Sequence, residues 1–317
     1  MLQKNDIFLN QRSDLATECM ELSFGKTKPD FDGIKTHHEK KGTVSIDTLD
    51  IMTDSGADKI GKPKGRYITL DIGKIWLYER QELESVCDVC SEILSELIPK
   101  TGSCLLAGLG NAQITADSQG PLCADFFIVN RHIKQHNPQL FSKLNLFETM
   151  CITPDVLGNT GVEAALTVKG IVDNLKPSFV IAVDSLASRK TSRLATTLQI
   201  SNVGITPGSG VGNHRMALNS ETLGVPVISM GIPTVVDAVT VGADILEEIF
   251  SKTESASIPQ DLRASILKSV LESGSYGYFV TPKNSDVISK SAARLIAMTI
   301  NKALNPHLSY SEMEELI

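Results

Sequence analysis

The stretch from Ser178 to Asp244 decides the fold class and reads SFVIAVDSLASRKTSRLATTLQISNVGITPGSGVGNHRMALNSETLGVPVISMGIPTVVDAVTVGAD. Its first part, from Phe179 to Val183, is a continuous apolar run that ends at Asp184. A run of this kind, rich in β-branched residues and without polar alternation, predicts a parallel strand buried on both faces. Ligands of open α/β sheets bind beyond the carboxyl ends of such strands, which is where Asp184 is expected.

The remainder of this stretch predicts a second strand and its helix. Residues 185–194 can open a helix, and residues 200–216, which include the glycine-rich GSGVG, form a run long enough for a functional loop. Residues 226–231 predict a second buried strand, and Pro233 is expected at the first position of the helix that follows.

A similar layout precedes this stretch. The run CLLAGLGN predicts a buried strand from Cys104 to Ala107, and Asp117 follows just before a helix whose first turn holds Pro121. If this strand neighbours the one before Asp184, about 4.8 Å away, the two acids face one crevice.

Other segments complete the fold prediction. Strands are expected at 43–51 and 66–72, joined by a connecting loop at 54–65, and helices at 79–98, 160–177 and 285–306. The fold class is therefore α/β, with an open, mixed, mostly parallel sheet and helices on both faces. No break between independent domains is visible, so a single domain with an N-terminal arm is predicted.

Composition narrows the function classes. The chain has 317 residues and a formal net charge of −7, which argues against direct binding to nucleic acid through phosphate contacts. No apolar stretch has the length of a membrane helix, and the polar N-terminus lacks a secretory core, so the expected location is the cytoplasm, away from membranes. The 6 cysteines are expected to be reduced.

Several motifs suggest other chemistries. The GSGVG run fits neither the dinucleotide nor the phosphate-loop pattern, and its backbone donors suit a substrate main chain as well as a phosphate. Gly208, Ser209 and Gly210 of this run are accordingly candidate substrate-binding residues, and Arg189 is a further candidate. A serine nucleophile on a GxSxG elbow is absent from the sequence.

Histidines and cysteines do not form a metal-binding pattern. His132 and His136 share a helix face but lack the glutamate of the zincin motif, since Ile133 takes that place. Cys87 and Cys90 form a single CxxC inside a helical segment and are expected to pack in the core. No metal and no cofactor are therefore predicted.

Asp117 and Asp184, the two acids expected at strand ends, are the remaining candidates for catalysis. Two carboxyl groups that share a site do not ionise together easily, so one keeps its proton. The ionised group can then take a proton from water while the protonated one polarises a carbonyl and later protonates the leaving group. This chemistry suits the hydrolysis of an amide.

At these residues the chain resembles the germination protease family of spore-forming bacteria. The resemblance is carried by RSDLATE, GRYITLD, AGLGNAQITADSQGP, VIAVDSLASR, TTLQISNVGITPGSGVGNHR, ETLGVPVISMGIPTVVDA and YFVTPK. It implies an endopeptidase that degrades small acid-soluble spore proteins at germination, located in the forespore or spore core and assembled as a homotetramer. It also implies catalytic roles for Asp117 and Asp184.

The resemblance further implies a zymogen. The family's target sequence, an acid, a large apolar residue, Ala, a small hydroxyl residue and Glu, matches Asp14 to Glu18. Self-cleavage is therefore expected between Asp14 and Leu15, with residues 1–14 as a propeptide and 15–317 as the peptidase domain. A helix start capped by Ser13 is the alternative for this stretch, and it is compatible with cleavage.

One difference between this sequence and the family's pattern bears on activity. The family's TPDALGP is TADSQGP here, which keeps Asp117, Gly120 and Pro121 but changes the neighbours of the acid. We expect retained activity with altered tuning; an inactive binder of spore proteins is the alternative. The GxGN followed by an acid is also similar to the hydrogenase-maturation endopeptidases, whose acids hold a metal together with a histidine, so a metal-dependent peptidase is a second alternative.

Overall fold

The computed structural model describes residues 13–25, 32–208, 215–252, 259–272 and 278–317. Its main sheet has eight strands in the order β1-β2-β3-β8-β9-β6-β4-β5. Their bounds are β1 Ile34–Lys41, β2 Val44–Ile51, β3 Gly65–Asp71, β4 Ser103–Gly108, β5 Glu148–Ile152, β6 Phe179–Val183, β8 Thr197–Ser201 and β9 Val227–Gly231. A second sheet pairs β11 (Phe279–Val280), β10 (Pro233–Asp237) and β7 (Leu186–Ser188) in that order.

The main sheet has a parallel half and an antiparallel half. Strands β9, β6, β4 and β5 pair in parallel, whereas β1, β2, β3 and β8 pair antiparallel, and β8 also meets β9 antiparallel. The mixed α/β class is as predicted. Parallel pairing occupies one half of the sheet in the described residues, a smaller part than the sequence suggested.

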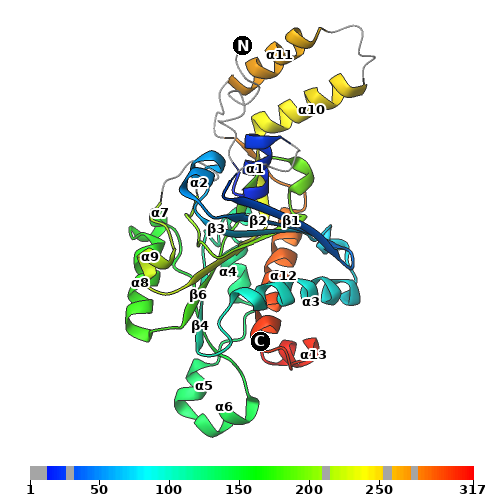
Figure 1. The fold of residues 1–317 in the computed structure, drawn as a ribbon. Helices are drawn as coiled ribbons and strands as arrows, with labels where there is room; N and C mark the ends of the chain where they lie inside the picture. The colour runs from blue at the N-terminus through cyan, green and yellow to red at the C-terminus, as the bar shows by residue number, and fades with distance from the viewer. Residues whose placement is uncertain (1–12, 26–31, 209–214, 253–258, 273–277) are drawn as a thin grey trace.

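Helices cover both faces of this sheet. The longer ones are α1 Ala16–Phe24, α3 Arg80–Leu97, α8 Ala164–Leu175, α10 Ala238–Lys252, α11 Gln260–Glu272 and α12 Ser285–Leu304. The shorter ones are α2 Asp54–Ile60, α4 Gln119–Ala124, α5 Arg131–His136, α6 Pro138–Leu144, α7 Leu157–Thr160, α9 Ser220–Leu223 and α13 Tyr310–Glu315, with 3₁₀ turns η1 Ile75–Leu77, η2 Thr115–Asp117 and η3 Thr191–Arg193. In Figure 1, α10 and α11 extend away from the body, and α5 and α6 lie at the opposite end.

The strand alternation of β6 separates the core into two layers. Phe179, Ile181 and Val183 face a large cluster that includes residues of α3, α4 and α12, whereas Val180 and Ala182 face a cluster with α8. All five side chains are buried, because β6 lies in the middle of the sheet and is covered on both faces. A strand so enclosed places its end, and therefore Asp184, at a fixed position.

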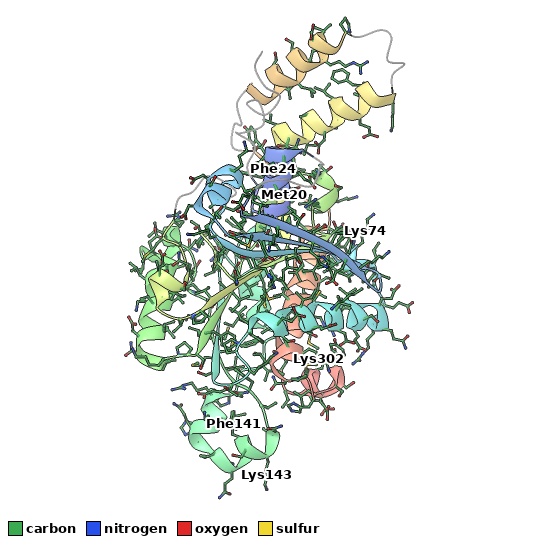
Figure 2. The ribbon with its side chains drawn as sticks, in the orientation of Figure 1. Met20, Phe24, Lys74, Phe141, Lys143 and Lys302 are labelled. Atoms are coloured by element: carbon green, nitrogen blue, oxygen red, sulfur yellow. The ribbon has the colours of Figure 1, made fainter. Side chains whose placement is uncertain are left out.

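The antiparallel half is covered on one face by the first helix. Ala16 of α1 packs with Leu49, Ile51 and Tyr67 from β2 and β3 in a third apolar cluster. Met20 and Phe24 extend from the same helix and pack against this cluster (Figure 2). The N-terminal segment is thereby part of the folded body from Ser13 onward, where the described residues begin.

Four local predictions were wrong. Residues 185–194 do not open a helix but form β7 and the single turn η3, and residues 200–216 begin inside β8 rather than in a loop. Pro233 starts β10 instead of a helix, which begins five residues later at Ala238. The connecting loop predicted at 54–65 contains α2, whose N-terminus is capped by the Thr53 hydroxyl.

Candidate active site

Asp184 is positioned by the end of β6. Its backbone N–H donates to the Met230 carbonyl of β9 at 3.1 Å, which continues the parallel ladder by one residue beyond Val183. Its Oδ1 accepts a hydrogen bond from the Ser185 N–H at 2.8 Å, and the residue is only 5% exposed. The carboxyl group is therefore held at the carboxyl edge of the sheet, out of contact with bulk water.

Asp117 is positioned by a tight turn after β4. Its Oδ2 accepts a hydrogen bond from the Asn111 N–H at 2.9 Å. Gly110 has φ of +107°, and a Cβ atom there would lie 2.0 Å from the Asp117 carbonyl oxygen. Only glycine permits both this conformation and this close approach, so the GLGN run fixes the carboxyl group of Asp117 over the strand end.

The turn that carries Asp117 is packed directly against the sheet. A Cβ atom on Gly120 would lie 2.2 Å from the Leu109 carbonyl oxygen and 2.5 Å from that of Val183, so glycine lets α4 touch the ends of β4 and β6. The side-chain amide of the fully buried Gln119 accepts from the Ile232 N–H at 2.8 Å and donates to the Ile232 carbonyl at 3.4 Å. These contacts attach the Asp117 turn to the connection between β9 and β10.

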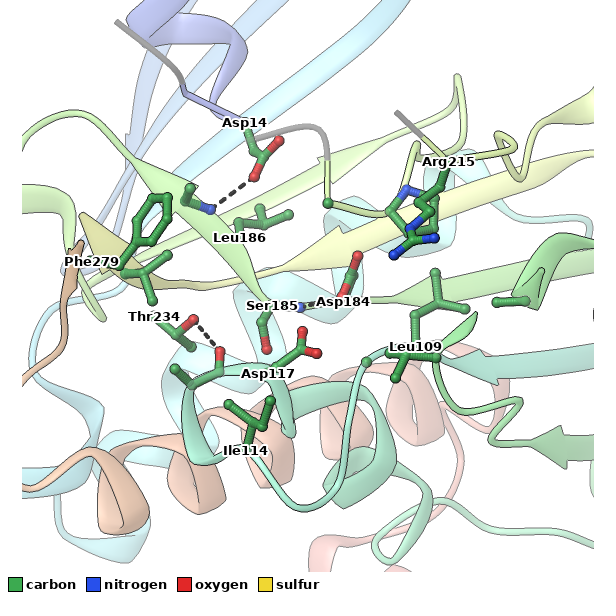
Figure 3. A pocket seen from close by; sticks show the side chains of 18 of the residues that line it. Asp14, Leu109, Ile114, Asp117, Asp184, Ser185, Leu186, Arg215, Thr234 and Phe279 are labelled. Carbon is green, nitrogen blue, oxygen red and sulfur yellow. Dashed lines mark hydrogen bonds between the residues drawn. The ribbon is translucent and has the colours of Figure 1, made fainter. Parts of the chain in front are cut away.

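Both acids line one cavity of about 520 Å³. Figure 3 shows Asp117 and Asp184 projecting into the same space, with Ser185 beside Asp117 and Arg215 on the side of Asp184. Strands β4 and β6 are in fact paired in parallel, with Gly108 opposite Val183. The sequence-based expectation that these two side chains meet in one crevice agrees with this geometry.

The electrostatic environments of the two acids differ. Burial raises the pKa of Asp184 well above its ordinary value, and the negative charges of Asp117 and Asp14 add to this effect. Burial also raises the pKa of Asp117, although the hydrogen bond from the Asn111 backbone opposes the shift. Asp184, the more deeply buried of the pair, is therefore the group that retains a proton to higher pH.

The N-terminal segment reaches the same cavity. Asp14 is one of its lining residues, and the Asp14 N–H donates to the Ala187 carbonyl of β7 at 2.9 Å. In return the Ala187 N–H donates to Oδ2 of Asp14 at 2.8 Å. Leu15 and Ala16 are both fully buried, so the Asp14–Leu15 peptide bond lies inside the folded body, and Asp14 lies on the wall of the cavity.

The other predicted site residues are placed differently. Gly208 lines the cavity, whereas Ser209 and Gly210 lie outside the described residues. Arg189 lies outside the lining as far as the described chain defines it; its backbone N–H donates to Oε2 of Glu18 at 2.6 Å. The role of Arg189 in substrate binding therefore stays a prediction.

Sequence reasoning missed three charged residues of the cavity. Asp155, Glu163 and Arg215 line it, and Nη1 of Arg215 lies 3.9 Å from Oε1 of Glu163. Asp155 follows β5, the parallel neighbour of β4, so the rule that identified Asp117 and Asp184 would also have identified it. Arg215 follows the glycine-rich run and belongs to no sequence motif that would have identified it as a site residue.

Within the described ranges, no group of three or more His, Cys, Asp or Glu side chains is arranged to hold a metal. Cys87 and Cys90 are buried on the inner face of α3, and burial raises the pKa of Cys87 to about 12.

Among the helices of the described residues, none is both long and apolar enough to cross a membrane.

Two carboxyl groups with different environments in one cavity can perform acid–base hydrolysis, and the comparisons agree with a hydrolase. The germination protease family matches residues 12–263. Germination proteases of Clostridium acetobutylicum and Caldanaerobacter subterraneus subsp. tengcongensis are 37% and 39% identical over 96% and 98% of this chain, and over 98% and 99% of their own lengths. One from Bacillus velezensis is 33% identical over 97% of this chain and 98% of its own length.

The chain therefore belongs to the germination protease family. It is a peptidase, that is, a hydrolase that acts on protein substrates. Among solved structures, a NiFe hydrogenase maturation protease HycI from Thermococcus kodakarensis KOD1 is similar at a TM-score of 0.36 and 16% identity, over 67% of this chain and 98% of that chain.

Proposed function

We propose that the chain is an endopeptidase that hydrolyses peptide bonds through Asp117 and Asp184. The observation that carries this proposal is their convergence in one cavity beside the Asp14 residue of the N-terminal segment. Peptide hydrolysis needs a base for the attacking water and an acid for the leaving nitrogen, and a pair of carboxyl groups with separated pKa values supplies both.

The environments of the two acids assign their roles. Asp184, with the more strongly raised pKa, is the protonated acid, and Asp117, which is less deeply buried, is the ionised base; each accepts one backbone hydrogen bond. Asp117 takes a proton from a water molecule while the oxygen of that water adds to the scissile carbonyl carbon. Asp184 then gives its proton to the departing nitrogen, and one proton exchange between the two groups restores the site.

The first substrate of this site is the chain itself. Cleavage between Asp14 and Leu15 removes residues 1–14 as a propeptide and leaves residues 15–317 as the peptidase domain. Two features support this: the hydrogen bonds that dock Asp14 on β7, and the match of residues 14–18 to the target sequence of the family. Because Asp14 lines the cavity, the uncut segment also obstructs entry of other substrates.

The biological substrates are small acid-soluble spore proteins, which the enzyme degrades at germination in the spore core. Full-length similarity to proteins named germination protease supports this role, as do residues 14–18, which carry the same target pattern within this chain. The active form is a homotetramer by resemblance to the family.

The test follows the N-terminus of the purified chain during incubation at mildly acidic pH. Wild type should convert to a form that begins at Leu15, measured by intact mass and N-terminal sequencing. Asp117→Asn and Asp184→Asn should keep Met1 under the same conditions. A spore protein added in trans should be cut by processed wild type alone; binding without cutting by all three proteins would instead support the inactive binder.

A further inference from the structure

The side-chain amide of Gln199 spans the peptide bond that we propose is cut. Gln199 lies in β8, opposite Thr69 of β3 and Gly231 of β9. Its Nε2 donates to the Asp14 carbonyl oxygen at 3.0 Å, and its Oε1 accepts from the Ala16 N–H at 2.7 Å. A peptide N–H can only donate, so the bond from Ala16 orients the amide and leaves the NH₂ group facing the Asp14 carbonyl.

From this contact we infer that Gln199 is a catalytic residue of self-cleavage, whose NH₂ group stabilises the oxyanion that forms on the Asp14 carbonyl. The inference rests on the proposed cleavage between Asp14 and Leu15. The carbonyl in contact with Nε2 is the one whose carbon the water attacks. A hydrogen-bond donor aimed at the oxygen where negative charge develops lowers the barrier of acyl transfer.

The step balances as an ordinary hydrolysis. The oxygen of water bonds to the carbonyl carbon of Asp14 while a carboxylate of the acid pair takes one water proton. The π electrons move onto the carbonyl oxygen, which the Gln199 amide stabilises. When the carbon–nitrogen bond breaks, the carbonyl re-forms and the Leu15 nitrogen takes the proton of the other, protonated acid, which yields a new carboxylic acid at Asp14 and an amine at Leu15. The new carboxylic acid then gives its proton to the amine, and one proton passes between the two acids of the pair to restore their starting states.

The donor and the carbonyl are both held in place before reaction. Gln199 is 8% exposed, and Leu15, which follows the Asp14 carbonyl that Gln199 contacts, is fully buried. On one side the peptide is fixed by the two hydrogen bonds between Asp14 and Ala187. On the other side the Glu18 carboxylate accepts from the N–H groups of Arg189 and Lys190, at 2.6 and 2.9 Å.

This fixed geometry has two consequences. A preorganised donor in a site that excludes water costs little reorganisation when charge develops. Removal of one such donor typically lowers the rate about 100- to 1,000-fold, so the effect of losing the Gln199 donor should be measurable.

The experiment compares self-cleavage of wild type, Gln199→Glu and Gln139→Glu. The first substitution keeps an oxygen that can accept from Ala16 but, when ionised, removes the donor to the Asp14 carbonyl. The second makes the same chemical change on exposed α6. At near-neutral pH, Gln199→Glu should cleave about 100-fold more slowly than wild type, and Gln139→Glu at the wild-type rate.

The pH dependence separates catalysis from structural support. As the pH falls, the introduced carboxyl group takes up a proton and can donate again, so the ratio of the Gln199→Glu rate to the wild-type rate should rise towards one. A second variant, Gln199→Met, has no group to titrate and should remain slow at every pH. Thermal unfolding of each variant checks that it folds.

Three outcomes would contradict the inference. Wild-type rates for Gln199→Met, or a pH-independent rate ratio for Gln199→Glu, would remove the catalytic role of Gln199 and leave the proposed self-cleavage standing. Absence of cleavage in wild type would overturn both.

Discussion

The two halves of the main sheet hold the two acids and the N-terminal segment in different ways. The parallel half contributes strand ends: Asp184 directly follows β6, and Asp117 lies in the turn after β4. The antiparallel half contributes a strand face, from which Gln199 of β8 and Thr69 of β3 contact the N-terminal segment. The acids are thus positioned by backbone register, whereas side-chain contacts from β8 and β3 add to the backbone pairing that holds the N-terminal segment.

This difference predicts unequal sensitivity to substitution. A group at a strand end that takes part in proton transfer has no substitute, so its removal should abolish the reaction. Contacts along the docked segment are several and share the same task, so the loss of any one should be partly tolerated.

The largest effect is expected at the parallel half. Asp184→Asn should slow self-cleavage about 10,000-fold, because the amide cannot deliver a proton to the leaving nitrogen. The rate is measured by intact mass over time. Asp173→Asn, the same change on the exposed side of α8, is the control and should cleave like wild type. A modest loss at Asp184 would mean that the strand-end acid is not part of the chemistry.

The next effect concerns the attachment of the Asp117 turn. Gln119→Ala removes two hydrogen bonds to the Ile232 backbone and should slow cleavage about 100-fold, because a shift of about 1 Å in a reacting group has that cost. It should also lower the free energy of unfolding by about 2 kcal/mol through buried unpaired groups. Gln139→Ala on exposed α6 is the control, and urea unfolding gives the stability change.

This variant also tests the altered TADSQGP motif. If Gln119→Ala lost stability but kept the wild-type rate, the Ile232 contact would be a packing feature with no bearing on the position of Asp117.

A smaller effect is expected at the antiparallel half. Glu18→Gln weakens the hydrogen bonds that the N–H groups of Arg189 and Lys190 donate to this side chain of the N-terminal helix, because a charged acceptor binds more strongly than a neutral one. Self-cleavage should slow about tenfold, which corresponds to roughly 1.4 kcal/mol. Glu21→Gln, whose partners are the side chains of Lys190 and Arg193, should have a weaker effect. A reversed order would show that Glu18 does not position the cleaved bond.

The smallest effect is a pH-dependent change in stability. The pKa of Asp184 is raised in the folded state, so as the pH rises the Asp184 carboxyl group loses its proton in the unfolded chain before it does so in the folded protein. Between the unfolded and the folded pKa, the stability of wild type therefore falls as the pH rises. Asp184→Asn lacks this loss and should gain up to about 1.4 kcal/mol over wild type for each pH unit in that window. Thermal unfolding at pH values from about 5 to 8 measures it; a constant difference would indicate an ionised Asp184 in the folded protein.

The two halves also differ in how well the sequence predicted them. β4, β6 and β9 were predicted correctly because each is an uninterrupted buried run between clear breaks, and their parallel order brings the ends together. β8 was missed although Thr197, Gln199 and Ser201 alternate with apolar residues as in a strand, because the pattern spans only five residues and runs into the glycine-rich segment. β7 was missed because three residues carry no periodicity. Gln199 could not be identified beforehand, since its importance arises from a contact with Asp14, 185 residues away.

Pro233 shows a related limit. The residues after it have apolar spacing that suits a helix or a strand, and proline is acceptable at the first position of either. Pairing of β10 with β7 decides between the two, and that pairing depends on the tertiary fold.

The pH–rate profile of self-cleavage, measured for wild type, Asp117→Asn and Asp184→Asn, tests the acid pair most directly. We expect a bell-shaped profile for wild type, in which the rate falls at low pH as Asp117 is protonated and at high pH as Asp184 loses its proton. Both variants should lie at least about 1,000-fold lower at all pH values. A variant that matches wild type at any pH, or a wild-type profile without either limb, would contradict the account.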